Sequence, residues 1–296
     1  MSTEIFQIVA PVFVVVGIGF FLEWRGMGFH AESLSRLAML LGTPALVFSS
    51  LTGTALPDDS LARIVAIAVS AVLVGGGIAF LILTAFRLPR TTFLAPLSLP
   101  NAGNAGLPIV FFAFADDGLA IGAAYFFTIA LVQYTVVPAL VSGELDLKKL
   151  LREPLIWSIV AVLLFRISDV APPGIVMDTT ELLGAMMIPV MLILLGGALA
   201  RLRVRDIGTS AALAFLRLAI GLSAGLSLLW LFDLSGVEAG AIFLLTAMPS
   251  ALVTYVIAEH YGKDAERVAG LVVSSTVLNF MLLPGLIAAA LYFAAA

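Results

Sequence analysis

The sequence contains no cysteine and only two histidines, His30 and His260, among its 296 residues. The lack of cysteine excludes disulfides and thiolate metal sites, and both histidines fall in polar segments far apart in the chain. Charge is scarce as well, at 11% of the residues, whereas a soluble domain has about 25%. We therefore expect neither a metal site nor a bound cofactor.

Hydrophobic residues make up 61% of the chain, and its mean hydropathy is +1.15. A folded chain this apolar could not cover its surface with polar groups, so its solvent is lipid. The composition predicts a multi-pass protein of the cell membrane that has no nucleic-acid partner. The N-terminus lacks the basic segment of a signal peptide, so the first apolar run is expected to stay as a span.

Ten runs of mostly apolar residues are long enough, or nearly so, to cross a bilayer as helices. The sixth is short, and the fourth and ninth are interrupted by prolines or polar residues. The sequence thus predicts an all-α membrane protein with ten transmembrane helices. The runs are Ile5–Leu22, Leu34–Leu51, Leu61–Phe86, Thr92–Phe114, Leu119–Val141, Leu155–Val170, Leu182–Leu199, Ile207–Phe232, Val237–Ala258 and Val268–Ala295.

Lysine and arginine are distributed unevenly between the two sets of connecting loops. Twelve lie in the loops that follow the odd-numbered runs, and two, Arg63 and Arg166, lie on the opposite side. Loops with an excess of lysine and arginine remain on the cytoplasmic side of the membrane. We therefore expect the loops that follow odd-numbered runs to be cytoplasmic and both chain termini to lie outside.

The prolines indicate an internal repeat, because four of them recur in order at offsets of 143 to 149 residues. The matched prolines are Pro11 with Pro154, Pro44 with Pro189, Pro100 with Pro249, and Pro138 with Pro284. We expect one repeat in residues 1–142, a cytoplasmic linker at 143–153 and a second repeat in residues 154–296. Five helices per repeat is an odd number, so the second copy is inverted, as in alternating-access transporters.

The fourth run cannot form a continuous helix, because Pro100 and Pro108 each lack an N–H and clash with the preceding turn. Between them, Gly103 permits unusual backbone angles, while Asn101 and Asn104 place two amides in the apolar layer. Unwound backbone at this depth is tolerated where it lines a cavity or packs against protein. The asparagines are therefore candidates for substrate contact or, alternatively, for capping the broken helix.

The matched ninth run breaks at Pro249, with Ser250 and Thr254 just beyond. Two broken helices that cross would direct half-helix N-termini, with their unpaired N–H groups, toward one point. Such a point suits the carboxylate of an organic anion. Ser250 and Thr254 could add hydrogen bonds or serve close helix packing.

Three further polar side chains fall inside apolar runs. Gln133 and Asn279 occupy equivalent places in the fifth and tenth runs, where they could contact the substrate or bond between helices. Arg217 is the one charge well inside a run, which suggests either attraction of the substrate or a structural role.

The chain resembles the auxin efflux carrier family, which includes plant PIN carriers and prokaryotic dicarboxylate permeases. The resemblance covers the whole chain and is carried by three features of the sequence. These are the asparagine–glycine break Asn101–Pro108, the proline-broken segment from Pro249 to Tyr261, and the tenth run with Ser274, Ser275, Thr276 and Pro284.

The resemblance implies a scaffold domain, a mobile domain with crossed broken helices, and elevator-like movement of small organic anions. It also implies a homodimer through the scaffold domain. The family asparagine corresponds to Asn101 or Asn104, whereas Ser250 stands near the place where plant members often have another amide. The short link Gly143–Glu153 is typical of prokaryotic members, so we expect a bacterial inner-membrane carrier.

Two other classes of function stay open. A sodium-coupled symporter like the bile-acid symporters would keep the fold, since unwound carbonyls and amides can bind sodium. Cation/proton antiport is disfavoured because no Asp or Glu falls in the middle of an apolar run. An enzyme is not expected, since no metal motif or nucleophile–base arrangement is present.

Overall fold

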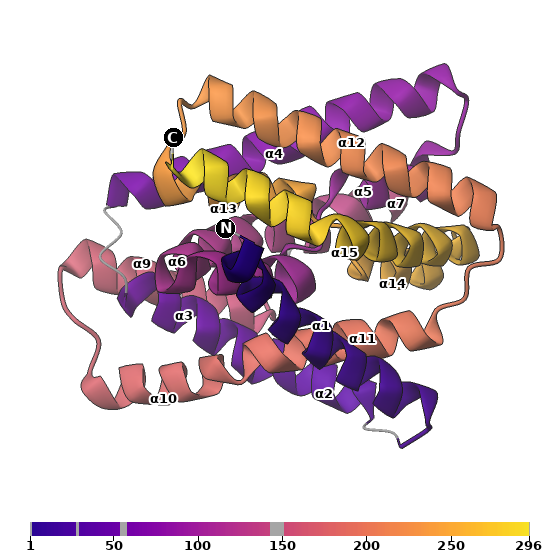
Figure 1. Ribbon diagram of the computed structural model, residues 1–296. Coiled ribbons are helices and arrows are strands. Elements are labelled where there is room, and N and C mark those ends of the chain that lie inside the picture. Colours follow the sequence, from indigo (N-terminus) through magenta and orange to yellow (C-terminus); the bar gives the residue numbers. More distant parts are fainter. Residues whose placement is uncertain (1, 28–29, 54–57, 143–150, 296) are drawn as a thin grey trace.

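The computed structural model describes residues 2–27, 30–53, 58–142 and 151–295, and within these ranges the chain is all-helical (Figure 1). Its helices are α1 Ser2–Trp24, α2 Ala31–Leu37, η1 Ala38–Gly42, α3 Thr43–Gly53, α4 Asp58–Ala85, α5 Arg90–Ser98, η2 Ala102–Gly106, α6 Leu107–Tyr134, α7 Val136–Ser142, α9 Pro154–Ser168, α10 Gly174–Ala185, α11 Met187–Arg201, α12 Ile207–Leu231, α13 Gly236–Ala247, α14 Val253–His260 and α15 Ala265–Ala295. Most of the predicted linker, residues 143–150, lies outside the described ranges.

Seven helical segments of the described chain are long and apolar enough to cross a membrane. They are Ile5–Trp24, Glu32–Gly53, Asp59–Ala85, Ala102–Val141, Gly174–Arg201, Ile207–Leu231 and Ala265–Ala295. Two shorter apolar helices, α9 and α13, accompany them. The chain is therefore a multi-pass membrane protein, as its composition predicts.

The segment Ala102–Val141 is too long for a single crossing, and α6 within it folds back on itself. Ala115 has φ 50° and ψ −139°, which no helix contains. A Cβ on Gly118 would lie 2.5 Å from the carbonyl oxygen of Val110, so the two legs of α6 touch directly after the turn. Only glycine permits this approach, and the turn separates the fourth predicted run from the fifth.

The helices pack as two groups that lie side by side (Figure 1). In the first, α1 packs along α11, and α3 packs between α9 and α10. In the second, α12, α13 and α15 pack together, α4 joins α5, α6 and α12, and α13 packs on α6. We call these the α1 group and the α15 group. Each combines helices from both halves of the sequence, and η2 and α6 meet α11 where the groups touch.

The α15 group contains two interrupted helices. Helix α5 ends at Ser98 and the chain resumes helical form at Ala102, while α13 ends at Ala247 and α14 begins at Val253. The interruptions include Pro100 and Pro249, which lack the N–H that a continuous helix would need. Helix breaks therefore occur at Pro100 and Pro249 as predicted, whereas the break predicted at Pro108 is wrong, because η2 continues into α6 with Pro108 in the first turn of α6.

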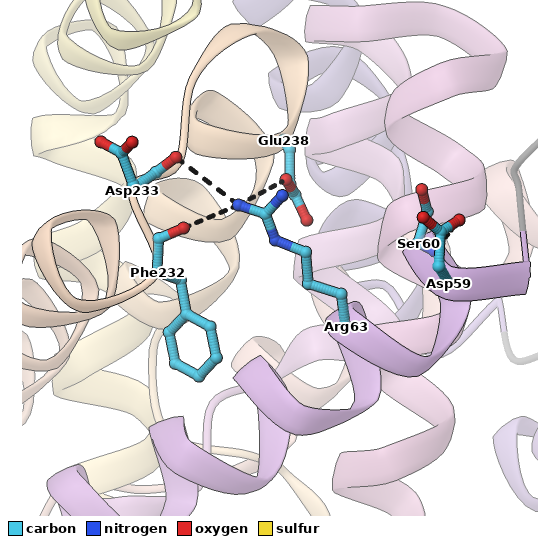
Figure 2. Close-up of polar contacts among 6 residues, drawn as sticks. All are labelled: Asp59, Ser60, Arg63, Phe232, Asp233 and Glu238. Carbon is cyan, nitrogen blue, oxygen red and sulfur yellow. Dashed lines mark hydrogen bonds and ion pairs between the residues drawn. The ribbon is translucent and has the colours of Figure 1, made fainter.

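Arg63 ties the start of α4 to the junction of α12 and α13 (Figure 2). Its guanidinium donates to the carbonyl oxygen of Phe232 at 2.7 Å and lies 3.7 Å from a carboxylate oxygen of Glu238. The carbonyl of Asp233 lies 3.5 Å away. One side chain thus satisfies carbonyls at the end of α12, which have no intrahelical partner.

The seventh predicted run begins too late. Helical structure starts at Gly174 rather than at Leu182. Met186 separates α10 from α11. The first turns of α10 contain Asp178, Thr179 and Glu181, which are polar enough to hide this segment from a search for apolar runs. Helix α10 packs on α3, but these three side chains are exposed, so hydropathy does not report that the segment is helical.

Candidate functional site

The two helix interruptions of the α15 group are joined through their backbones. The N–H of Asn101 donates to the carbonyl oxygen of Pro249 at 2.8 Å, and the N–H of Ala251 donates to that of Leu99 at 3.1 Å. Pro100 and Ser250 face each other as an isolated antiparallel bridge. We call this junction the crossover. The bridge satisfies backbone groups that the helix breaks release, as an apolar surrounding requires.

Asn101 caps a helix with one side-chain atom and has an unpaired hydrogen-bond donor at the other. Its Oδ1 accepts the backbone N–H of Asn104 at 3.2 Å, so the side chain is the N-cap of η2. The opposite atom, Nδ2, is buried without a hydrogen-bond partner, in a residue only 5% exposed. A buried amide N–H left unpaired is costly. The geometry therefore leaves one polar donor at the crossover for a ligand.

A cavity of about 100 Å³ lies beside the crossover, between the two helix groups. The α15 group contributes amide side chains to its wall, and the α1 group contributes methionines and small polar residues. Its polar lining includes Ser35, Thr43, Asn101, Asn104, Gln133 and Glu153. Its apolar lining includes Met39, Phe126, Met187, Met191 and Leu194.

Two helix starts also face the cavity. Helix η2 continues directly into α6, and its first residues, Ala102 and Gly103, line the cavity. Leu252 and Val253, where α14 begins, line it from the other interruption. The first N–H groups of a helix have no intrahelical acceptor and bear a partial positive charge. The cavity is therefore suited to a negatively charged group.

A second hollow of about 250 Å³ adjoins the cavity and shares Tyr134, Glu153 and Val253 with it. His260 and Tyr261 lie in its wall. These residues mark the end of the bundle where α9 begins and α14 ends. The site is thus connected to that end of the protein.

Ser250 and Thr254 brace the second interruption from within. The N–H of Ser250 donates to Oγ of Ser275 at 3.1 Å, and Oγ1 of Thr254 donates to the carbonyl oxygen of Ala251 at 2.6 Å. Both residues are buried, and neither lines the cavity. Oγ of Ser250 is buried without a partner.

Asn279 and Arg217 hold the end of α13. Nδ2 of Asn279 donates to the carbonyl oxygen of Ala247 at 2.6 Å, and the guanidinium of Arg217 donates to that of Thr246 at 3.1 Å. These carbonyls belong to the last turn of α13, which has no intrahelical donors for them. Neither side chain lines the cavity.

The structure thus brings four of the predicted site residues together at the cavity: Asn101, Gly103, Asn104 and Gln133. Pro100, Pro249 and Ser250 form the crossover, and the remaining three (Thr254, Asn279 and Arg217) support it from behind.

Sequence reasoning missed the wall that the α1 group supplies. Thr43, Met187 and Met191 line this wall. The signal that could have found it is the matched proline pair, because Thr43 precedes Pro44 and the two methionines flank Pro189.

Comparison with known proteins gives two matches. A family described as "Membrane transport protein" matches residues 139–287, just over half of the chain. An "Uncharacterized transporter" of Methanothermobacter thermautotrophicus is 26% identical over 295 residues, covering 94% of this chain and 96% of its own length.

Proposed function

The chain belongs to the membrane transport protein family, to which auxin efflux carriers belong, and we propose that it carries a small organic anion across the membrane. The transport is secondary and proceeds by alternating access at the crossover. The observation that carries this proposal is the unpaired Nδ2 of Asn101, buried beside a cavity that two helix starts also face.

A carboxylate fits the polar half of this cavity. Nδ2 of Asn101 would donate to one of its oxygens, and the first N–H groups of η2 and α14 would stabilise its charge. Glu153 lines the cavity as well, where a second negative group on the ligand would be disfavoured. A monocarboxylate is therefore favoured over a dicarboxylate.

The opposite wall favours an apolar body on the same ligand. Met39, Met187 and Met191 present flexible, polarisable side chains there, and Phe126 of α6 adds an aromatic ring from the crossover side, beside Gly103. Methionines adapt to aromatic and irregular apolar surfaces. Among small carboxylates, an indolic or other aromatic acid matches both walls.

Ten crossings in two inverted five-helix repeats account for the helices better than seven separate spans do. The turn at Ala115 divides the longest segment into two legs. The first leg completes the crossing that α5 and η2 begin, and the interrupted pair α13–α14 and the shorter α9 supply the other two crossings. Pro100 and Ser250 bridge in antiparallel fashion, which supports an inverted relation between the repeats.

The two helix groups support an elevator movement. The α15 group holds the crossover, the α1 group supplies the facing wall, and the cavity lies between them. Sliding of one group against the other would carry the ligand while the backbone bridge stays intact. The adjoining hollow leads to the predicted cytoplasmic end, so this conformation faces inward.

A thermal-shift experiment on purified protein tests the proposal. A panel of carboxylates, with indole-3-acetate and succinate as representatives, is added in sodium and in potassium buffer. Ligands that bind only the folded state raise the apparent melting temperature. We expect aromatic monocarboxylates to stabilise the protein most.

Sodium-coupled symport is the alternative, and the buffer comparison decides it. Stabilisation that requires sodium would assign symport. A panel in which no carboxylate stabilises the protein in either buffer, while a neutral or cationic solute does, would contradict the anion assignment.

A further inference from the structure

Arg217 lies at the back of the crossover, inside the α15 group. It is 1% exposed, although it is the one charged residue in α12. Its guanidinium reaches the carbonyl oxygen of Thr246 because Gly221 and Gly225 let α13 lie directly against α12. Within the described residues, Arg217 makes no ion pair with a carboxylate.

The position of Arg217 matters because interrupted helices have negative ends as well as positive ones. Thr246 and Ala247 form the C-terminal end of α13, where carbonyls without intrahelical donors amount to about half a negative charge. That end points at the same crossover as the helix starts that face the cavity. Without compensation, the negative ends would offset the positive ones.

One small cavity shows that Arg217 is next to both negative ends. It measures about 10 Å³, and its lining includes Ser98 at the end of α5, Thr246 at the end of α13, and Pro100 of the crossover. Arg217 and Tyr125 complete the polar part of this lining. A single guanidinium therefore stands behind both broken helices, and Pro100 separates it from the ligand side.

We propose that Arg217 determines the anion selectivity of the crossover without touching the ligand. Its charge compensates the C-terminal ends of α5 and α13, so that the positive starts of η2–α6 and α14 dominate the field in the cavity. Buried charges are screened far less than exposed ones, so this effect reaches through the protein. The inference rests on the proposed anion transport and names the residue that makes the site select a negatively charged substrate.

Two substitutions separate charge from hydrogen bonding. Arg217→Gln keeps a donor for the carbonyl of Thr246 and removes the charge, whereas Arg217→Lys keeps the charge with a different donor geometry. Binding of indole-3-acetate and of its uncharged counterpart indole-3-acetamide is measured on purified protein by calorimetry. If another carboxylate of the panel binds better, that carboxylate and its own amide replace the pair.

We expect Arg217→Gln to weaken carboxylate binding about tenfold, a loss typical of one charge acting through protein of intermediate dielectric. Amide binding should not change, and Arg217→Lys should bind both ligands as the wild type does. Equal losses for acid and amide, or identical behaviour of the Gln and Lys variants, would show a purely structural role and overturn the inference.

A second measurement covers the case in which Arg217→Gln does not fold. Asn279→Asp leaves Arg217 in place and adds a negative charge of nearly the same shape at the end of α13. This variant should also weaken binding of the acid and leave binding of the amide unchanged. Equal effects on the binding of both ligands would overturn the inference. If the wild type binds no carboxylate at all, the proposed function fails first, which distinguishes the two failures.

Discussion

Asn101 donates its backbone N–H to the carbonyl oxygen of Pro249, 2.8 Å away, and so joins two helix interruptions from opposite halves of the chain. The same residue caps η2 through Oδ1 and leaves Nδ2 without a partner. One asparagine thus holds the backbone of the site through its N–H and Oδ1, while its Nδ2 is the donor that we propose for a ligand.

Substitution of Asn101 tests the donor directly. Asn101→Asp keeps the oxygen that accepts the N–H of Asn104 but replaces the donor with negative charge, so folding should persist while carboxylate binding is lost. Asn101→Ala should weaken binding roughly 10- to 100-fold, as expected for a hydrogen bond to a charged group. Calorimetry with indole-3-acetate measures both. Carboxylate affinity that is unchanged in either variant would remove Asn101 from the ligand site.

Gly118 is predicted to be essential for the turn within α6. Gly118→Ala places a Cβ against the carbonyl of Val110 and should destabilise the protein by about 1–3 kcal/mol. Gly77→Ala is the matched control, because a Cβ there meets no atom within 4 Å. That variant should be neutral or more stable by up to about 1 kcal/mol. Melting temperatures in detergent compare the two, and similar values would contradict the tight turn.

Arg63 is predicted to stabilise the junction of α4 with α12 and α13 only modestly. Its side chain is 43% exposed, so Arg63→Ala should cost about 1 kcal/mol or less. Arg36→Ala is the control, because the Arg36–Glu32 pair is far more exposed and should contribute nothing measurable. If thermal unfolding shows equal shifts for both variants, the contacts of Arg63 with Phe232 and Glu238 are not stabilising.

Asp206 gives a prediction about pH. It caps α12 by accepting the N–H of Thr209 at 3.1 Å, and the hydrogen bonds from Thr209 lower the pKa of its carboxyl below the usual value. Stability from a lowered pKa is present above the unfolded-state value, about 3.9, and is lost as pH falls through the folded-state value. The melting temperature should therefore lose this contribution only below about pH 4.

Asp206→Asn keeps a capping oxygen without a titrating group, so it should remove this acid-dependent part of the melting curve. Melting temperatures of wild type and variant are compared at neutral pH and at about pH 3. An identical fall in both proteins would show that the Asp206 cap does not contribute.

The orientation predicted from charged loops can be tested by labelling, because the natural chain has no cysteine. Asp59→Cys and Arg203→Cys place single thiols at exposed positions in the first turn of α4 and before α12. A membrane-impermeant maleimide should label the first variant in intact cells and the second only after permeabilisation. Five crossings separate the two positions in the ten-crossing arrangement, so they must lie on opposite sides of the membrane. Labelling of both variants from the same side would exclude that arrangement.

Several features followed from local properties of the sequence. Apolar runs identified a multi-pass membrane protein, and the family prediction is confirmed. Prolines placed both helix interruptions, because a missing N–H acts at the residue where it occurs. The start of α10 at Gly174 escaped prediction, since polar residues in its first turns interrupt the apolar pattern by which the runs were found.

What the sequence by itself determined was therefore the solvent of the protein, the two places where its helices break, and four residues that meet at the cavity, three of them with amide side chains. Tertiary structure alone decided that Asn101 pairs with Pro249, that methionines of the α1 group form the facing wall, and that Arg217 stands behind the crossover instead of in it. The physical reason is the distance along the chain over which each effect acts. Hydropathy and backbone restriction act within a few residues, whereas the partner of a buried polar group is fixed only when distant helices pack together.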